Sequence, residues 1–376
     1  MNLLLEYQNK FLNFLKKLKN DKIIYFPDSI KGLTVELTPK NKNADISCNM
    51  ALILVKFNDK TSIEIANILK KNISENFQEF EKIEVAKPGF ININFTLDFW
   101  KDYLLQIIKY NLKYGSNKNL RKKYNVEFVS ANPTGPLHVG HCRGAVLGDA
   151  ISNLLKFNGH FVTKEYYVND YGSQVRSFVV SVYYRILEIT EKKKFPTGKD
   201  LYPGDYIIDI AKKIINEKKI KDYSNFDKIY KKLLELSLKF SILIIKNNLN
   251  ILGIKHDIFT YESDLIKKKL VIKTVEQLKK NKHIYKGKLQ QPKGEPTNDW
   301  KKRNQLLFNS TKFGDDMDRA LQKEDKTWTY FAGDIAYHAH KIDRNFDVLI
   351  NILGADHSGY VKRIKAAVSA ISENKA

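Results

Sequence analysis

The chain has 376 residues, of which 43% are hydrophobic and 12% aromatic, so it can bury a substantial core and is not disordered throughout. No run approaches the roughly 18–20 apolar residues of a membrane span, and residues 1–22 lack the compact apolar block of a signal peptide. Two cysteines, Cys48 and Cys142, cannot form a disulfide framework and fit no zinc spacing. We therefore expect a soluble cytoplasmic protein without a membrane association.

The formal charge of +22 has two explanations. A polyanionic partner such as RNA would account for it. However, only eight of the 64 basic residues are arginine, and lysine, asparagine and isoleucine are plentiful, which is typical of an AT-rich coding sequence. The charge is therefore compatible with RNA binding but does not demonstrate it.

The N-terminal part, residues 1–113, has the pattern of a small α/β domain. Apolar spacing predicts two helices and then a pair of strands joined at Pro88-Gly89: residues 3–18, 63–73 and 83–95. The polar stretch 114–119 marks a boundary, so a second domain is expected over residues 120–376.

The second domain begins with a strand–loop–helix–strand pattern, which predicts a parallel sheet covered by helices. The predicted elements are residues 126–129, 140–157 and 161–168. Lysine-rich helical segments follow, and the αβ rhythm returns near Trp328 with a helix, a strand and a further helix: residues 334–342, 348–353 and 360 onward. We therefore predict a Rossmann-like α/β fold with a helical insertion over about 176–327.

The most informative segment is Asn-Pro-Thr-Gly-Pro-Leu-His-Val-Gly-His at residues 132–141, between the first strand and its helix. A helix N-terminus offers unpaired N–H groups, and His138 and His141, three residues apart, can both reach one bound phosphate. Gly140 leaves room for a ligand against the backbone. The pattern favours a nucleotide that is attacked at phosphorus, although two histidines on a loop can also be surface or capping residues.

The run VEFVSANPTGPLHVGHCRGAVLGDAISNLLKFNGHFVTKEYYVNDYGSQV (126–175) resembles the signature region of class I aminoacyl-tRNA synthetases, in the form found in arginyl-tRNA synthetases. Four further segments resemble the same family in the same order: EVAKPGFINI (84–93), LFNSTKFGDDMDR (307–319), WTYFAGDIAYHAHK (328–341) and LGADHSGYVKRIKAA (353–367). The resemblance thus covers nearly the whole chain. It implies a Rossmann-like class I catalytic domain preceded by a small α/β domain that helps to hold tRNA.

The resemblance also implies two sets of binding residues. Catalytic His138 and His141 would hold the ATP phosphates, within an ATP site made of Pro133, Thr134, Gly135, His138, Gly140, His141, Asp356 and His357. An arginine pocket would be made of Glu127, Ser130, Asn132, Tyr330 and Asp334.

The chemistry of these residue types fits arginine. A guanidinium is planar and always charged, so the carboxylates of Glu127 and Asp334 are suitable partners, with the Tyr330 hydroxyl one helical turn before Asp334. Asn132 can both donate to and accept from the substrate's amino and carboxylate groups.

Structural alternatives exist for most of these residues. Glu127 could be an exposed residue at a strand start, Tyr330 could belong to the core, and Asp334 could be the N-cap of its helix. Asp356 could pair with Arg363, and His357 could be a packed histidine. No other histidine has partners at metal-ligand spacing, so no metal site is predicted.

The reaction implied by the resemblance has two steps. The L-arginine carboxylate attacks the α-phosphate of ATP, with Mg²⁺ neutralising phosphate oxygens, and the arginyl group then passes to tRNA(Arg). The protein is expected to be a monomer.

The chain also departs from the family pattern. No segment matches the KMSKS-type lysine loop or the helical anticodon-binding domain, so we interpret the chain as truncated, with weak or no activity alone. The alternatives are another nucleotidyltransferase with a His-x-Gly-His turn, or a non-catalytic RNA-binding fragment or paralogue. The acidic arginine pocket argues against the first, and the retained His138, His141, Asn132 and Asp334 argue against the second.

Overall fold

The computed structural model describes residues 2–39, 43–117, 121–198, 200–289, 304–354 and 359–373. The chain divides into two compact units, Met1–Asn117 and Lys118–Ala376. The predicted α/β class is confirmed, and the second unit contains the predicted parallel sheet. None of the helices within the described ranges has the length and apolar character needed to cross a membrane.

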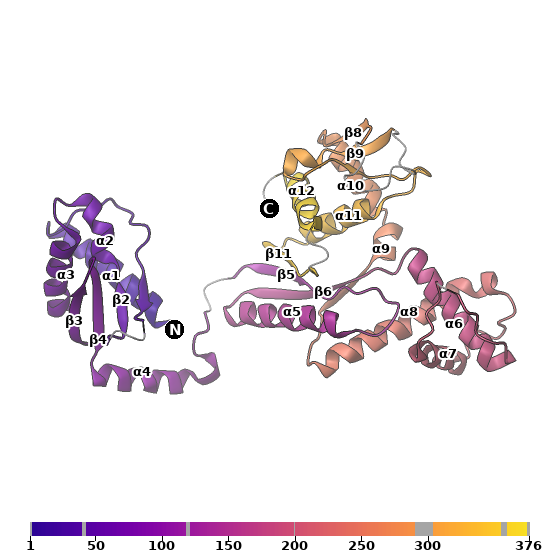
Figure 1. Ribbon diagram of the computed structural model, residues 1–376, viewed down its shortest axis with the longest axis horizontal. Helices are drawn as coiled ribbons and strands as arrows, with labels where there is room; N and C mark the ends of the chain where they lie inside the picture. The colour runs from indigo at the N-terminus through magenta and orange to yellow at the C-terminus, as the bar shows by residue number, and fades with distance from the viewer. Residues whose placement is uncertain are drawn as a thin grey trace. The chain divides into compact units, whose positions relative to one another are not determined.

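The first unit is built on a four-stranded antiparallel sheet in the order β1-β2-β4-β3 (Figure 1). Its elements are α1 (Leu3–Asn20), β1 (Val35–Leu37), β2 (Ile46–Cys48), α2 (Met50–Leu54), η1 (Val55–Phe57), α3 (Ser62–Asn76), β3 (Phe80–Ala86), β4 (Phe90–Phe95), α4 (Leu97–Tyr110) and η2 (Asn111–Lys113). The predicted helices and strand pair are all present. Their apolar faces meet in one core, in which Tyr7, Phe11 and Ile91 are fully buried.

The second unit contains a four-stranded parallel sheet in the order β11-β5-β6-β7. Its strands are β5 (Lys123–Glu127), β6 (Phe161–Val168), β7 (Ile258–Tyr261) and β11 (Val348–Asn351), and α5 (Val139–Phe157) joins β5 to β6. The parallel β5–α5–β6 unit agrees with the prediction. β7 lies inside segment 176–327, which the sequence predicts as one helical insertion. The segment is therefore divided into two parts, one between β6 and β7 and one between β7 and β11.

The two faces of this sheet differ in chemistry because successive strand residues point to opposite sides. Val126 and Phe128 of the first strand segment, with Tyr166 and Val168 of β6, form an apolar core with α5 and α8 (Phe226–Ile251). The intervening residues are polar and face α11 (Tyr330–Ile342): Asn125, Glu127 and Glu165. Figure 1 shows α11 across the sheet from α5 and α8.

Three helices, α6 (Ser173–Glu191), α7 (Asp205–Glu217) and α8, form a subdomain after β6 (Figure 1). They pack around a core of their own that includes Phe178, Ile210, Ile214 and Leu236, each fully buried. From here on, the term helical insertion means α6–α8 alone and not the whole predicted segment 176–327. All three helices contribute to this apolar cluster, and the C-terminal half of α8 also packs against the parallel sheet.

The rest of the unit surrounds α11. A three-stranded antiparallel sheet, β10-β9-β8, and two further helices share a core with α11 that includes Phe308, Ile335 and Ala367. These elements are α9 (Glu262–Lys267), α10 (Leu270–Lys280), β8 (Ile284–Gly287), β9 (Gln305–Phe308), η3 (Ser310–Phe313), β10 (Arg319–Ala320) and α12 (Val361–Ile371). The apolar side of α11 packs in this core, and the polar side of the helix faces the parallel sheet.

Helix α5 approaches the parallel sheet closely at Gly148, and this contact yields a stability prediction. A Cβ at Gly148 would lie 2.2 Å from Cγ of Phe128, so Gly148→Ala should force α5 away from the sheet and lower the free energy of unfolding by about 2–3 kcal/mol. Gly144→Ala, in the same helix with open space around it, should instead be neutral or stabilising by up to about 1 kcal/mol. Urea unfolding of both variants tests this; equal effects would contradict the packing described.

Candidate active site

The chain leaves β5 through a strained turn into the segment that we call the signature loop (residues 130–138). Val129 and Ser130 both have positive φ, 69° and 43°, which is costly for residues with a Cβ and for valine above all. Local hydrogen bonds hold the turn: the Ser130 hydroxyl donates to Oε1 of Glu127 at 3.0 Å and accepts from the Tyr167 backbone N–H at 3.1 Å. Such strain is concentrated at functional sites, where the surroundings fix an unfavourable conformation.

The two histidines of the signature loop stack on one another at the N-terminus of α5. Their ring centroids are 3.7 Å apart with an interplanar angle of 26°. His138 is the N-cap residue: its Nδ1 accepts from the Gly140 N–H at 3.1 Å, and Nδ1 of His141 accepts from the His138 N–H at 3.3 Å. Both Nδ1 atoms are therefore unprotonated acceptors, and each neutral ring carries its proton on Nε2.

This arrangement makes two Nε2–H donors and a helix N-terminus available to an anion. Burial, together with the adjacent His138, lowers the pKa of His141, which favours its neutral form. Gly140 also accommodates a neighbouring ring. A Cβ there would lie 3.0 Å from Cε1 of His138, so the glycine makes room for the capping ring.

Glu127 is the last residue of β5, not an exposed residue at a strand start, which corrects that alternative. Its Oε2 pairs with Nζ of Lys341 on α11 at 2.5 Å, and its side chain is only 12% exposed. Because Oε1 accepts from Ser130, both oxygens already have protein partners. The negative charge of Glu127 is therefore neutralised by Lys341.

A chain of polar contacts extends from this ion pair. Lys341, which is fully buried, also donates to Oδ1 of Asn351 at the end of β11 at 3.0 Å. Asn351 Nδ2 lies 2.8 Å from Nε2 of His338, whose Nδ1 lies 2.8 Å from the Asp334 carbonyl oxygen. Asn351 donates to Nε2, so His338 carries its proton on Nδ1 and donates to the carbonyl. The network fixes α11 to the ends of β5 and β11.

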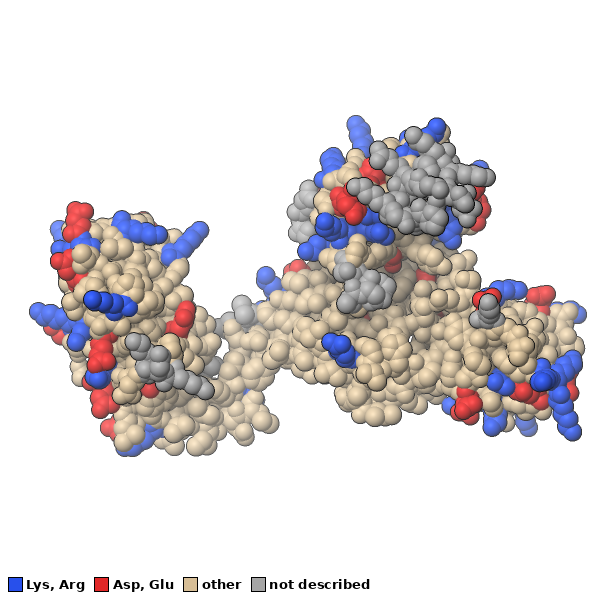
Figure 2. Space-filling model, in the orientation of Figure 1, with Lys and Arg blue, Asp and Glu red and all other residues tan. Residues whose placement is uncertain are grey.

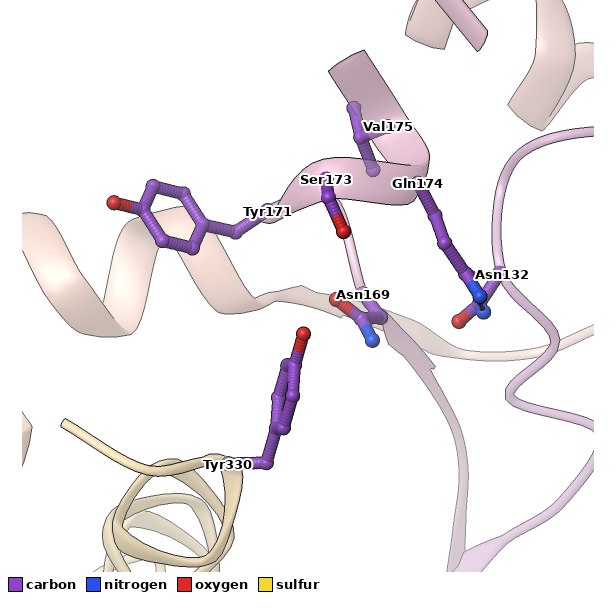
Figure 3. Close-up of a pocket in the computed structure, with 7 residues that line it drawn as sticks. All are labelled: Asn132, Asn169, Tyr171, Ser173, Gln174, Val175 and Tyr330. Carbon is purple, nitrogen blue, oxygen red and sulfur yellow. Dashed lines mark hydrogen bonds between the residues drawn. The ribbon is translucent and has the colours of Figure 1, made fainter. Parts of the chain in front are cut away.

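A cavity of about 240 Å³ lies between the signature loop, the start of α6 and the start of α11, and is lined by Asn132, Asn169, Tyr171, Ser173, Gln174, Val175 and Tyr330. In Figure 3, the Tyr330 hydroxyl points into this pocket, Asn132 and Gln174 lie side by side, and Tyr171 is turned away. Asn132 donates to Oε1 of Gln174 at 2.7 Å. Tyr330 is 63% exposed, so it is not a core residue.

Two carboxylic acids are neighbours of residues that line this pocket: Glu262 pairs with the Asn169 amide, and Asp334 lies one helical turn after Tyr330 on α11. Burial raises the pKa of Glu262 to about 7, and the nearby charges of Asp334 and Asp170 raise it further. Burial also raises the pKa of Asp334 to about 6, although a hydrogen bond from the Tyr360 hydroxyl lowers it. Neither carboxyl group has a cationic side chain paired with it among the residues that the structure describes. A pair of acids whose ionised forms repel each other provides a place for a cation.

Glu262 and its supports were missed from the sequence. Glu262 directly follows β7, where parallel sheets bind ligands, but β7 itself was not predicted. Asn169 lines the pocket and donates to Oε2 of Glu262 at 2.6 Å. Asp170 accepts from the Ser263 N–H at 2.8 Å and from its hydroxyl at 2.6 Å, which ties the end of β6 to α9. Asn169 and Asp170 follow a correctly predicted strand, so their position was a usable signal.

Comparison with known families decides the relationship that these features suggest. Residues 103–374 match the family described as tRNA synthetases class I (R), catalytic domain, and residues 6–95 match the arginyl tRNA synthetase N terminal domain. The chain belongs to the arginyl-tRNA synthetase family.

Relatives within the arginyl-tRNA synthetase family align along the whole chain. An arginine–tRNA ligase of Pelagibacter ubique (strain HTCC1062) is 52% identical over 100% of this chain, and one of Ehrlichia ruminantium (strain Gardel) is 46% identical over 96%. The chain spans 65% and 63% of the lengths of these two proteins. A solved arginyl-tRNA synthetase from Plasmodium falciparum has the same fold, with a TM-score of 0.62, 20% identity, and coverage of 98% of this chain and 62% of that one.

The family resemblance and the Rossmann-like class I fold predicted from the sequence are thereby confirmed. The structure brings Asn132 and Tyr330 to one pocket, whose lining includes neither Glu127 nor Asp334; Asp334 lies one helical turn after Tyr330 on α11. Asp334 is not the N-cap of its helix. The N-cap of α11 is Thr329, whose hydroxyl oxygen accepts a hydrogen bond from the Ala332 N–H. Asp356 and His357 lie outside the described residues.

The buried ion pair between Lys341 and Glu127 leads to a second stability prediction. Lys341→Met should lower the free energy of unfolding by about 3–5 kcal/mol, because it leaves the Glu127 carboxylate without its counter-charge. Adding Glu127→Gln should recover part of this loss. Lys232→Met, which breaks the exposed pair with Glu235, should change stability by less than about 1 kcal/mol. Urea unfolding of the four proteins would refute the prediction if both lysine variants behaved alike.

Proposed function

We propose that the protein is an arginine–tRNA ligase: it activates L-arginine with ATP and transfers the arginyl group to tRNA(Arg). The family membership supports the reaction class. The observation that carries the substrate assignment is the pair of carboxyl groups, Glu262 and Asp334, which have raised pKa values and are neighbours of residues that line the pocket. In a chain of net charge +22, two acids that have no basic partner among the residues that the structure describes are suited to a cationic substrate.

Each end of the amino acid has a proposed partner. The guanidinium would lie against Asp334 and Glu262, with the Tyr330 hydroxyl as a further acceptor. Asn132, at the start of the signature loop, would contact the α-amino or carboxylate group, while Glu127 accepts an additional hydrogen bond without adding net charge. The substrate carboxylate would then face the signature loop.

We propose that ATP lies with its phosphates against the signature loop, where Nε2–H of His138 and of His141 donate to phosphate oxygens at the N-terminus of α5. Pro133, Thr134, Gly135 and Gly140 would supply backbone to the same site. Mg²⁺ would enter with ATP and neutralise its phosphate oxygens. The histidines would stabilise charge on the phosphates while the arginine carboxylate attacks the α-phosphate.

We also propose that the first unit contributes to tRNA binding. A hollow of about 430 Å³ in this unit is lined mainly by polar side chains, among them Asn43, Asn67, Lys70 and Asn92, which suit sugar and phosphate groups. Figure 2 shows basic and acidic side chains interspersed on the visible face, so the net charge alone does not mark the RNA surface. By the same family resemblance, we propose a cytoplasmic location.

Substrate selectivity tests the proposal directly. In calorimetric titrations with ATP present, L-arginine should bind, and citrulline, which is neutral but similar in shape, should bind at least about 100-fold more weakly. Lysine, with no planar fork of donors, should also bind poorly. Asp334→Asn or Glu262→Gln should weaken arginine binding by roughly 2–3 kcal/mol with little effect on citrulline. Citrulline binding as strongly as arginine would refute the carboxylate pocket.

The acidity of the pocket should also make arginine binding depend on pH. The raised pKa values, about 6 for Asp334 and about 7 for Glu262, mean that both groups are partly protonated in mildly acidic solution. Because the cation favours the ionised forms, affinity should rise from about pH 5 to about pH 8, with proton release on binding. Calorimetry in buffers of different ionisation enthalpy measures that release. A double variant, Asp334→Asn with Glu262→Gln, should abolish it, whereas affinity that falls with rising pH would contradict the assignment.

A further inference from the structure

The signature loop is held by the helical insertion at three successive points. Asn132 donates to Gln174 of α6 at 2.7 Å. The Tyr206 hydroxyl of α7 donates to the Thr134 carbonyl oxygen at 2.9 Å. The Leu137 N–H donates to Oδ1 of Asn248 on α8 at 3.1 Å. Each of the three helices thus supplies one polar contact.

The contact at α7 is also a steric one. A Cβ on Gly135 would lie 3.0 Å from the Tyr206 hydroxyl oxygen and 3.1 Å from Cζ, so the phenol ring packs directly against the loop backbone. Tyr206 is itself among the side chains packed on the insertion core. A change in the packing of α7 would therefore move the loop.

The loop has a separate attachment to the parallel sheet at its beginning, where the Tyr166 hydroxyl donates to the Ala131 carbonyl oxygen at 2.8 Å. Beyond that point the Thr134 carbonyl oxygen is held by Tyr206, which packs on the insertion core. The Leu137 N–H is held by Asn248, which lies on the part of α8 that packs against the parallel sheet. The loop therefore has one attachment to the parallel sheet at Ala131 and further attachments to α7 and α8 in its second half.

We propose that Tyr206 and Asn248 are positioning residues through which the helical insertion sets the conformation of the phosphate-binding loop and so the affinity for ATP. This inference rests on the proposed ATP site at His138 and His141.

Hydrogen exchange followed by mass spectrometry tests the anchoring without requiring ATP. Tyr206→Phe and Asn248→Leu should each accelerate exchange of the loop amides, at positions 134, 135, 137 and 138, by about fivefold, as expected for the loss of one ordinary hydrogen bond. Asn248→Asp, which keeps an acceptor oxygen for the Leu137 N–H, should restore protection. Loop exchange that stays at the wild-type rate in both variants would overturn the proposal.

The matched control is Tyr183→Phe. The Tyr183 hydroxyl donates to the Tyr223 carbonyl oxygen at 2.8 Å, which is the same kind of bond made within the insertion and away from the loop. This variant should leave loop exchange unchanged. If it accelerates loop exchange as much as Tyr206→Phe, the effect reflects general loosening of the helices and the specific anchoring is wrong.

Titration with ATP and magnesium tests the consequence for binding. Tyr206→Phe and Asn248→Leu should weaken ATP binding by about fivefold, with L-arginine affinity at the wild-type value and Tyr183→Phe indistinguishable from wild type. Faster loop exchange with unchanged ATP affinity would overturn the coupling. The proposed function fails differently: in that case the wild-type protein would bind ATP no better than the His138→Ala, His141→Ala double variant.

Discussion

Charged side chains, together with a ring contact between Tyr167 of β6 and Tyr337, attach α11 to the end of the parallel sheet. Lys341 pairs with Glu127 at the end of β5, and Arg344, just beyond the helix, pairs with Glu165 of β6 at 2.6 Å. Glu165 is fully buried and also accepts from Thr260 of β7 at 2.6 Å. Burying these charges is unfavourable unless each is paired, so the layer tolerates few other arrangements. The register of α11 on the sheet, and with it the position of Tyr330 and Asp334, depends on these pairs.

The same layer explains the charge distribution around the pocket. Glu127 and Glu165 have basic partners within hydrogen-bonding distance, whereas the basic partners described do not extend to Asp334 and Glu262. This part of the structure therefore combines two carboxylates that are paired with basic side chains with two, Asp334 and Glu262, for which we propose a cationic substrate as partner. Specific recognition of a cation requires this separation, since a neutralised acid attracts a substrate only weakly.

Local features were predictable from the sequence, and long-range pairings were not. The helix that begins at the signature histidines and the strand ending at Val168 follow from periodicity and from turn residues, which act over a few positions. β7 escaped prediction because four residues between lysine-rich helices carry too short a pattern. Lys341 illustrates the deeper limit: a lysine on a helix normally predicts solvent exposure, and its partner Glu127 is 214 residues away. Glu262 was missed for the same reason, because its place in the pocket exists only once β7 joins the sheet. The binding roles of Asn132, Tyr330 and Asp334 stay predictions, although the fold brings Asn132 and Tyr330 to one pocket.

The bonds made by Nδ1 of His138 and His141 have a consequence for which side chains these positions can accept. In the proposed ATP site each ring would perform two tasks with two different atoms, since Nδ1 holds the backbone at the start of α5 and Nε2–H would donate to a phosphate. Asparagine reaches only as far as the first of these atoms, and glutamine places its amide nitrogen near the second. Neither can reproduce both, and a longer cation would supply charge without the backbone bond. Imidazole is the side chain that can both accept the backbone hydrogen bond and present a neutral donor. A substitution at either position would therefore lose one of these two functions.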